Sequence, residues 1–144
     1  MIRNIIIFFS LINLSFYAMP CSFAGLEHEI EFEPQSAALG IKNAKTLTEW
    51  FIKWRDGVGV GSIAISATSI ENDPYSATIS HERMRNIAQI IKPLNKQDAP
   101  IDEFYERGPV PVSSPLAFRS NFAFIVVQPA CLKTNTCCSM RIPE

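Results

Sequence analysis

Three stretches of the chain show regular patterns of apolar and polar positions. Residues 26–33 (LEHEIEFE) alternate strictly, which predicts a half-buried strand whose glutamate row faces water. Residues 119–128 are apolar on both faces, which predicts a strand near the centre of a sheet. A helix with one apolar face is expected over about 80–92. Its apolar residues, spaced i, i+3, i+4 and i+7, are Met84, Ile87, Ala88 and Ile91.

Start and stop signals set the bounds of the remaining elements. Ser80 is expected to cap the helix just described. Thr46-Leu47-Thr48-Glu49 matches a capping box, so another helix is expected to begin there and to end at Gly57. Shorter strands are expected over about 60–68 and 101–107. The order strand, helix, strand, helix, short strand, strand predicts an α+β domain with both helices packed on one face of a small sheet.

Three aromatic side chains on the apolar faces allow two interpretations. Trp50 and Trp54 lie one turn apart and could form a ligand platform, but packing in the core is the better prediction. His28 lies on the apolar side of the first strand and is interpreted as a core or edge histidine.

The N-terminus has the pattern of a secretory signal peptide. A charged start, an apolar run and a small-x-small site predict that residues 1–24 are removed by cleavage after Ala24. A membrane anchor is the alternative, but Asn13 and Ser15 interrupt the run, which is shorter than the ~20 residues that a spanning helix needs. A lipoprotein acylated on Cys21 is a further alternative.

Length and cysteine content predict how the chain after residue 24 is divided. With 144 residues, 47% of them hydrophobic, the sequence predicts one small domain over 25–130, followed by a tail over 131–144. In an oxidising compartment Cys131 is expected to pair with Cys137 or with Cys138. No spacing of cysteines and histidines suggests a metal site.

Charge and motifs exclude several classes of function. Without residues 1–24 the chain has 12 Lys and Arg against 14 Asp and Glu, which does not suggest binding to nucleic acid. There is no GK[ST] phosphate loop and no Gly-x-Ser-x-Gly elbow. We therefore expect no catalytic residues, no cofactor and no enzyme activity, and no transmembrane segment in the mature chain.

Four segments, in order, match the motifs of a known family. They are 30–39 (IEFEPQSAAL), 65–68 (ISAT), 75–83 (YSATISHER) and 121–127 (NFAFIVV). Their order and spacing resemble those of the C-terminal OmpA-like domain, the peptidoglycan-associated module of Gram-negative envelopes. The resemblance implies a βαβαββ-type sandwich with a small mixed sheet, a periplasmic location and a non-catalytic role.

The same resemblance implies a binding site for the stem peptide of peptidoglycan. The resemblance implies that an aspartate at the end of the second strand and an arginine on the second helix hold diaminopimelate, whose ammonium and carboxylate need groups of opposite charge. Arg83 matches the arginine, but Thr68 occupies the aspartate position and Ser76 the position of an asparagine. Asp73 or Glu71 could supply the missing carboxylate from the intervening loop.

Two functions remain open from the sequence. The first is binding of peptidoglycan through Arg83. The second is a periplasmic protein-binding module, such as an immunity protein, an inhibitor or a subunit of an envelope machine, that has lost this site and carries an apolar, proline-rich loop at 108–116. In the second case Arg83 would be a solvated arginine or one in a salt bridge with Glu82 or Asp73.

Overall fold

The computed structural model of the chain describes residues 25–108, 120–134 and 136–137. Three expectations lie outside these residues: the signal peptide with Cys21, most of the proline-rich loop, and Cys138 as a disulfide partner.

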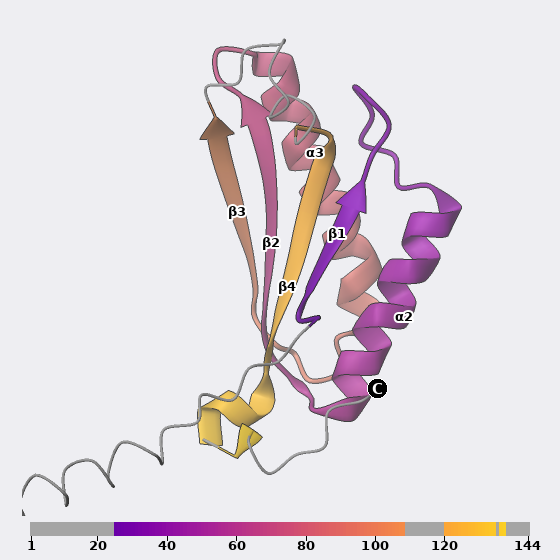
Figure 1. Ribbon diagram of the computed structural model, residues 1–144, viewed down its shortest axis with the longest axis vertical. Helices are drawn as coiled ribbons and strands as arrows, with labels where there is room; N and C mark the ends of the chain where they lie inside the picture. The colour runs from indigo at the N-terminus through magenta and orange to yellow at the C-terminus, as the bar shows by residue number, and fades with distance from the viewer. Residues whose placement is uncertain (1–24, 109–119, 135, 138–144) are drawn as a thin grey trace, which may run out of the picture.

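The described residues form one four-stranded mixed sheet and two long helices (Figure 1). The strand order is β1-β4-β2-β3, in which β4 is antiparallel to both neighbours and β3 is parallel to β2. The predicted α+β class is confirmed, and so is the central place of β4. The elements are β1 (Glu27–Glu31), α2 (Ile41–Gly57), β2 (Val60–Ile70), α3 (Pro74–Ile91), β3 (Ile101–Gly108) and β4 (Phe122–Pro129), with short 3-10 helices at Lys92–Leu94 and Ala130–Thr134.

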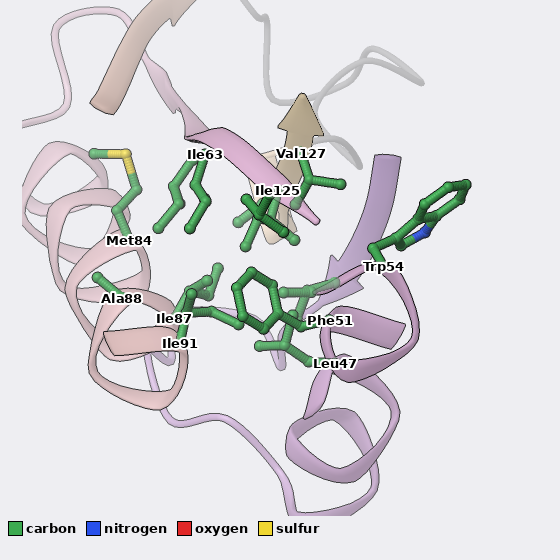
Figure 2. Packing of buried hydrophobic residues seen from close by; sticks show 14 of the residues in the cluster. Leu47, Phe51, Trp54, Ile63, Met84, Ile87, Ala88, Ile91, Ile125 and Val127 are labelled. Atoms are coloured by element: carbon green, nitrogen blue, oxygen red, sulfur yellow. The ribbon is translucent and has the colours of Figure 1, made fainter. Parts of the chain in front are cut away.

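Both helices cover the same face of the sheet, as predicted. Along β2, every second residue from Ile63 to Ser69 is buried, and these residues face α2 and α3. Figure 2 shows the side chains of Leu47 and Phe51 from α2 meeting those of Ile87 from α3 beneath the sheet. Burial of each such side chain stabilises the fold by roughly 1.5–3 kcal/mol.

The predicted start of the first helix is wrong. α2 begins at Ile41, after the N-cap Gly40, so the apparent capping box lies inside the helix. There the hydroxyl of Thr46 donates a hydrogen bond back to the carbonyl of Asn43, 3.1 Å away. The helix ends at Gly57, as predicted, and Gly59 follows in the left-handed conformation, with φ of 73°.

The predicted N-cap of the second helix is wrong as well. α3 begins at Pro74, and Asp73 caps it. Proline at the first helical position and aspartate before it are both favoured, because proline lacks an N–H and the carboxylate accepts two of the free ones. Ser80 lies inside the helix, and its hydroxyl donates to the carbonyl of Thr68 at 3.0 Å.

Core packing explains the two tryptophans. The indole N–H groups of Trp50 and Trp54 both donate to the carbonyl oxygen of Gly25, at 2.8 and 2.9 Å. Trp54 is buried, and His28 stacks on Trp50 with ring centroids 5.2 Å apart. These contacts fasten the start of β1 to α2, and they confirm the structural interpretation of all three side chains.

The segment after β4 contains a disulfide. Cys131 bonds to Cys137, with their Cα atoms 4.9 Å apart, so the structure forms one of the two predicted pairs. No described helix is long and apolar enough to cross a membrane. Among the described residues, no group of three or more His, Cys, Asp or Glu side chains could hold a metal ion.

Candidate functional site

Arg83 is a buried charge that fastens three parts of the chain together. Its side chain is only 2% exposed, and among the described residues it is the only charged side chain that is buried. Its Nε donates to the carbonyl of Ser36 at 2.8 Å, its Nη1 to that of Ser120, and its Nη2 to that of Glu33 at 3.2 Å. The guanidinium also lies 4.9 Å from the ring centre of Phe32. Arg83 therefore anchors the segment after β1 and the entry to β4 onto α3.

Arg83 is neither solvated nor in a salt bridge, so both structural interpretations from the sequence are wrong. Burial lowers the pKa of its guanidinium, because desolvation penalises the charged form. Among the described residues no carboxylate forms an ion pair with it. Backbone carbonyls occupy three of its five N–H donors, which leaves two for another acceptor.

A small cavity of about 110 Å³ opens beside Arg83. Asp73 and Ser76 from the start of α3 line it together with Arg83. We refer to it as the Asp73–Arg83 pocket. Its other lining residues are Gln35, Ile70, Tyr75, Ile79, Ser120 and Asn121.

The start of α3 holds the carboxylate of this pocket in place. Oδ1 of Asp73 accepts hydrogen bonds from the backbone N–H groups of Tyr75 and Ser76, at 3.0 and 3.1 Å. The hydroxyl of Ser76 in turn accepts from the backbone N–H of Ile70 at 3.0 Å, which ties the helix to the end of β2. Oδ2 of Asp73 has no hydrogen bond within the described residues and is available to a ligand.

The structure does not bring Thr68 to the Asp73–Arg83 pocket. Side chains alternate along β2, and Ala67 and Ser69 are the residues that face the helices. Thr68 therefore points to the opposite face of the sheet from Arg83. Of the residues that the sequence singles out, Arg83, Asp73 and Ser76 meet in one pocket and Thr68 does not.

A wider cavity of about 530 Å³ lies next to the small one. Ile70 and Asp73 line both cavities, and Glu71 and Arg107 line the wider one. Tyr105 forms its wall, with its hydroxyl hydrogen-bonded to that of Ser69.

Tyr105 and Arg107, two residues that line the wider cavity, were not predicted from the sequence. Arg107 lies over the ring of Tyr105, 5.7 Å from its centre, and His81 stacks on the same ring at 4.5 Å. The parallel pairing of β3 with β2 brings Tyr105 and Arg107 beside α3, and no local pattern in the sequence reports that pairing.

The two cavities together suit a ligand with both charges. The carboxylate of Asp73 complements an ammonium group, and the remaining N–H groups of Arg83 complement a carboxylate. The small pocket has room for the end of an amino acid that carries both charges, and the wider cavity has room for the peptide attached to it.

Comparisons with known proteins give a match at the level of structure. No family model matches the sequence, and no curated protein matches it. Among solved structures, the OmpA-like domain of FopA1 from Francisella tularensis is 18% identical, with a TM-score of 0.51 over 72% of each chain. The cell wall anchor of the T6SS from Pseudomonas aeruginosa is 15% identical, with a TM-score of 0.50 over 70% of this chain and 80% of that one.

A third solved structure gives a similar superposition. The C-terminal domain of Helicobacter pylori MotB is 11% identical, with a TM-score of 0.54 over 78% of this chain and 92% of that one. At these identities the likeness concerns the arrangement of helices and strands. The chain has the fold of the OmpA-like domains of bacterial cell envelopes.

Proposed function

We propose that this chain is a non-catalytic periplasmic protein of the cell envelope that binds the zwitterionic end of a peptidoglycan stem peptide in the Asp73–Arg83 pocket. One observation carries the proposal: a carboxylate and a guanidinium line the same small cavity. The carboxylate comes from the loop before α3, so the pair of charges is complete although Thr68 is uncharged.

Both charged groups keep bonding capacity for a ligand. An ammonium group would bind Oδ2 of Asp73, and a carboxylate would accept from the two remaining N–H groups of Arg83. Hydrogen bonds to charged groups contribute about 1.5–3 kcal/mol each. Arg83 is already held by three carbonyls, so its ordering is not a further cost of binding.

Two further observations support the proposal. The similar structure from Pseudomonas aeruginosa is described as a cell wall anchor, which is the role proposed here. Among the described residues that line the pocket there is neither histidine nor cysteine, which favours binding over catalysis.

The experiment is a calorimetric titration of a diaminopimelate-containing muropeptide into the purified chain and into its Asp73→Asn variant. Asparagine caps helices about as well as aspartate, so the variant keeps the start of α3 and loses only the charge. We expect wild type to bind and Asp73→Asn to bind at least tenfold more weakly. Asp102→Asn, which removes an exposed carboxylate from β3, is the matched control and should bind as wild type does. Equal affinity of wild type and Asp73→Asn would contradict the proposal.

A protein-binding role is the second candidate. The observation that favours it is the sheet face opposite the helices, on which Phe104 is 54% exposed. Exposed aromatic side chains on a flat face are typical of surfaces that bind other proteins.

A further inference from the structure

The face of the sheet that lies away from α2 and α3 combines apolar side chains with acidic ones. We call it the outer face. The pairing of the strands places Glu29, Phe124, Ser66 and Phe104 in one row across it. The next row contains Glu27, Val126, Ala64 and Asp102. Among the residues that the structure describes, no helix covers this face (Figure 1).

The centre of the outer face is apolar. Phe124 and Val126 on β4 are only partly buried, and Phe104 on the edge strand β3 is 54% exposed. Tyr105, the next residue, faces α3 and stacks on His81, which fixes the direction of Phe104 toward the outer face. Partly exposed side chains of this size lose contact with water when a partner covers them, at about 25 cal/mol per Å² of apolar surface.

The edges of the outer face are acidic. Glu27, Glu29 and Glu31 follow one another along β1, and Asp102 lies on β3 at the opposite edge. All four are exposed, and none forms an ion pair with another described residue. No lysine or arginine of the described strands lies on this face, so the negative charge is uncompensated.

The negative charge of the outer face indicates that its partner is positively charged. A second copy of the chain would bring two acidic faces together, which is repulsive. A surface that places lysine or arginine on both sides of an apolar stripe complements the outer face instead. The span from β1 to β3 is three strand spacings, or about 14 Å. An α-helix with its side chains is about 10–12 Å across, so it fits between the acidic edges.

We propose that the outer face binds a basic amphipathic helix of another protein. The apolar stripe of the helix lies on Phe104, Phe124 and Val126, and its lysine and arginine side chains reach the glutamates of β1 and Asp102 of β3. This binding surface is on the other side of the sheet from the Asp73–Arg83 pocket, so the two functions are independent.

The test uses a fluorescein-labelled 18-residue helical peptide with leucine on one face and lysine on the other, titrated with the purified chain at 150 mM salt. We expect the anisotropy to report binding that weakens at least tenfold in Phe104→Ser and in Glu29→Lys. Glu82→Lys, which makes the same change of charge on the exposed side of α3, is the matched control and should bind as wild type does.

Three results would overturn the proposal. Weakening in Glu82→Lys equal to that in Glu29→Lys would show that binding follows net charge alone. Equal binding of a peptide with glutamate in place of lysine would exclude charge complementarity. If wild type is a dimer in sedimentation equilibrium and Phe104→Ser is a monomer, the outer face binds a second copy of the chain.

The folding control is muropeptide binding by Phe104→Ser. Wild-type affinity shows that the Asp73–Arg83 pocket has remained intact in the variant.

Discussion

The carboxylate of Asp73 and the guanidinium of Arg83 line one cavity of about 110 Å³, although residues 74–82 of α3 separate them in sequence. Both groups also stabilise the fold, since Asp73 caps the helix and Arg83 donates hydrogen bonds to three backbone carbonyls. The pocket therefore uses charges that the fold already holds in place, and its geometry is set before a ligand arrives.

Arg83 makes a large contribution to stability. In Arg83→Ala the carbonyls of Glu33, Ser36 and Ser120 lose their donor, and we expect the free energy of unfolding to fall by roughly 2–4 kcal/mol, since a buried polar group without a partner costs about 1–3 kcal/mol. Urea denaturation measures the change. Arg85→Ala, an exposed arginine on the same helix, should stay within about 0.5 kcal/mol of wild type. Similar losses in the two variants would show that Arg83 is not an anchor.

Thr68→Asp should not create or strengthen binding of the stem peptide. The side chain of Thr68 points to the sheet face opposite Arg83, so a carboxylate there cannot complete the pocket. Calorimetry with the muropeptide should give the wild-type affinity for this variant. A gain of tenfold or more would mean that the strand register or the direction of residue 68 differs from the structure described here.

Stability should depend on pH through His28. Burial lowers the pKa of its imidazole from the ordinary 6.5, so below that value the unfolded chain binds more protons than the folded one. The free energy of unfolding should therefore fall as pH drops from 7.5 through 6.5 toward the lowered value. The difference between wild type and His28→Gln, followed by urea denaturation between pH 7.5 and 5.5, isolates this contribution. A parallel pH dependence of the two proteins would contradict it.

The Cys131–Cys137 disulfide should stabilise the end of the domain. It closes a loop with a sequence separation of 6, for which the chain-entropy relation gives about 2 kcal/mol. A phosphine reductant should lower the thermal midpoint of wild type and leave that of a Cys131→Ala/Cys137→Ala double variant unchanged. Insensitivity of wild type to the reductant would show that the bond adds no stability.

Most of the fold could be predicted from the sequence, because periodicity reports which face of an element is buried. The alternation of residues 26–33 and the doubly apolar 119–128 correspond to β1 and the central β4. Helix starts were predicted less well. The capping box at Thr46 was wrong because the motif is short and recurs by chance inside helices. Asp73 and Pro74 carry the true start signal of α3, although Asp73 was expected in the loop before the helix.

The candidate site was predicted only in part. Arg83 was identified from a resemblance, and Asp73 was one of two loop carboxylates considered as its partner. Their meeting depends on where α3 begins, six residues before the predicted Ser80 cap. The three carbonyl partners of Arg83 could not be predicted, because every residue has a backbone carbonyl and the sequence does not show which of them lie near Arg83. The same holds for Tyr105 and Arg107, whose positions follow from a parallel strand pairing.

The central claim is that the Asp73–Arg83 pocket recognises both charges of one amino acid end. The most direct measurement compares, by calorimetry, two stem peptides that differ in one group. In the first the terminal amine of diaminopimelate is free, and in the second that amine is acetylated. Wild type should bind the free form at least tenfold more tightly, and Asp73→Asn should bind the two forms with equal affinity. Equal affinity of wild type for both peptides, or no binding of either, would contradict the claim.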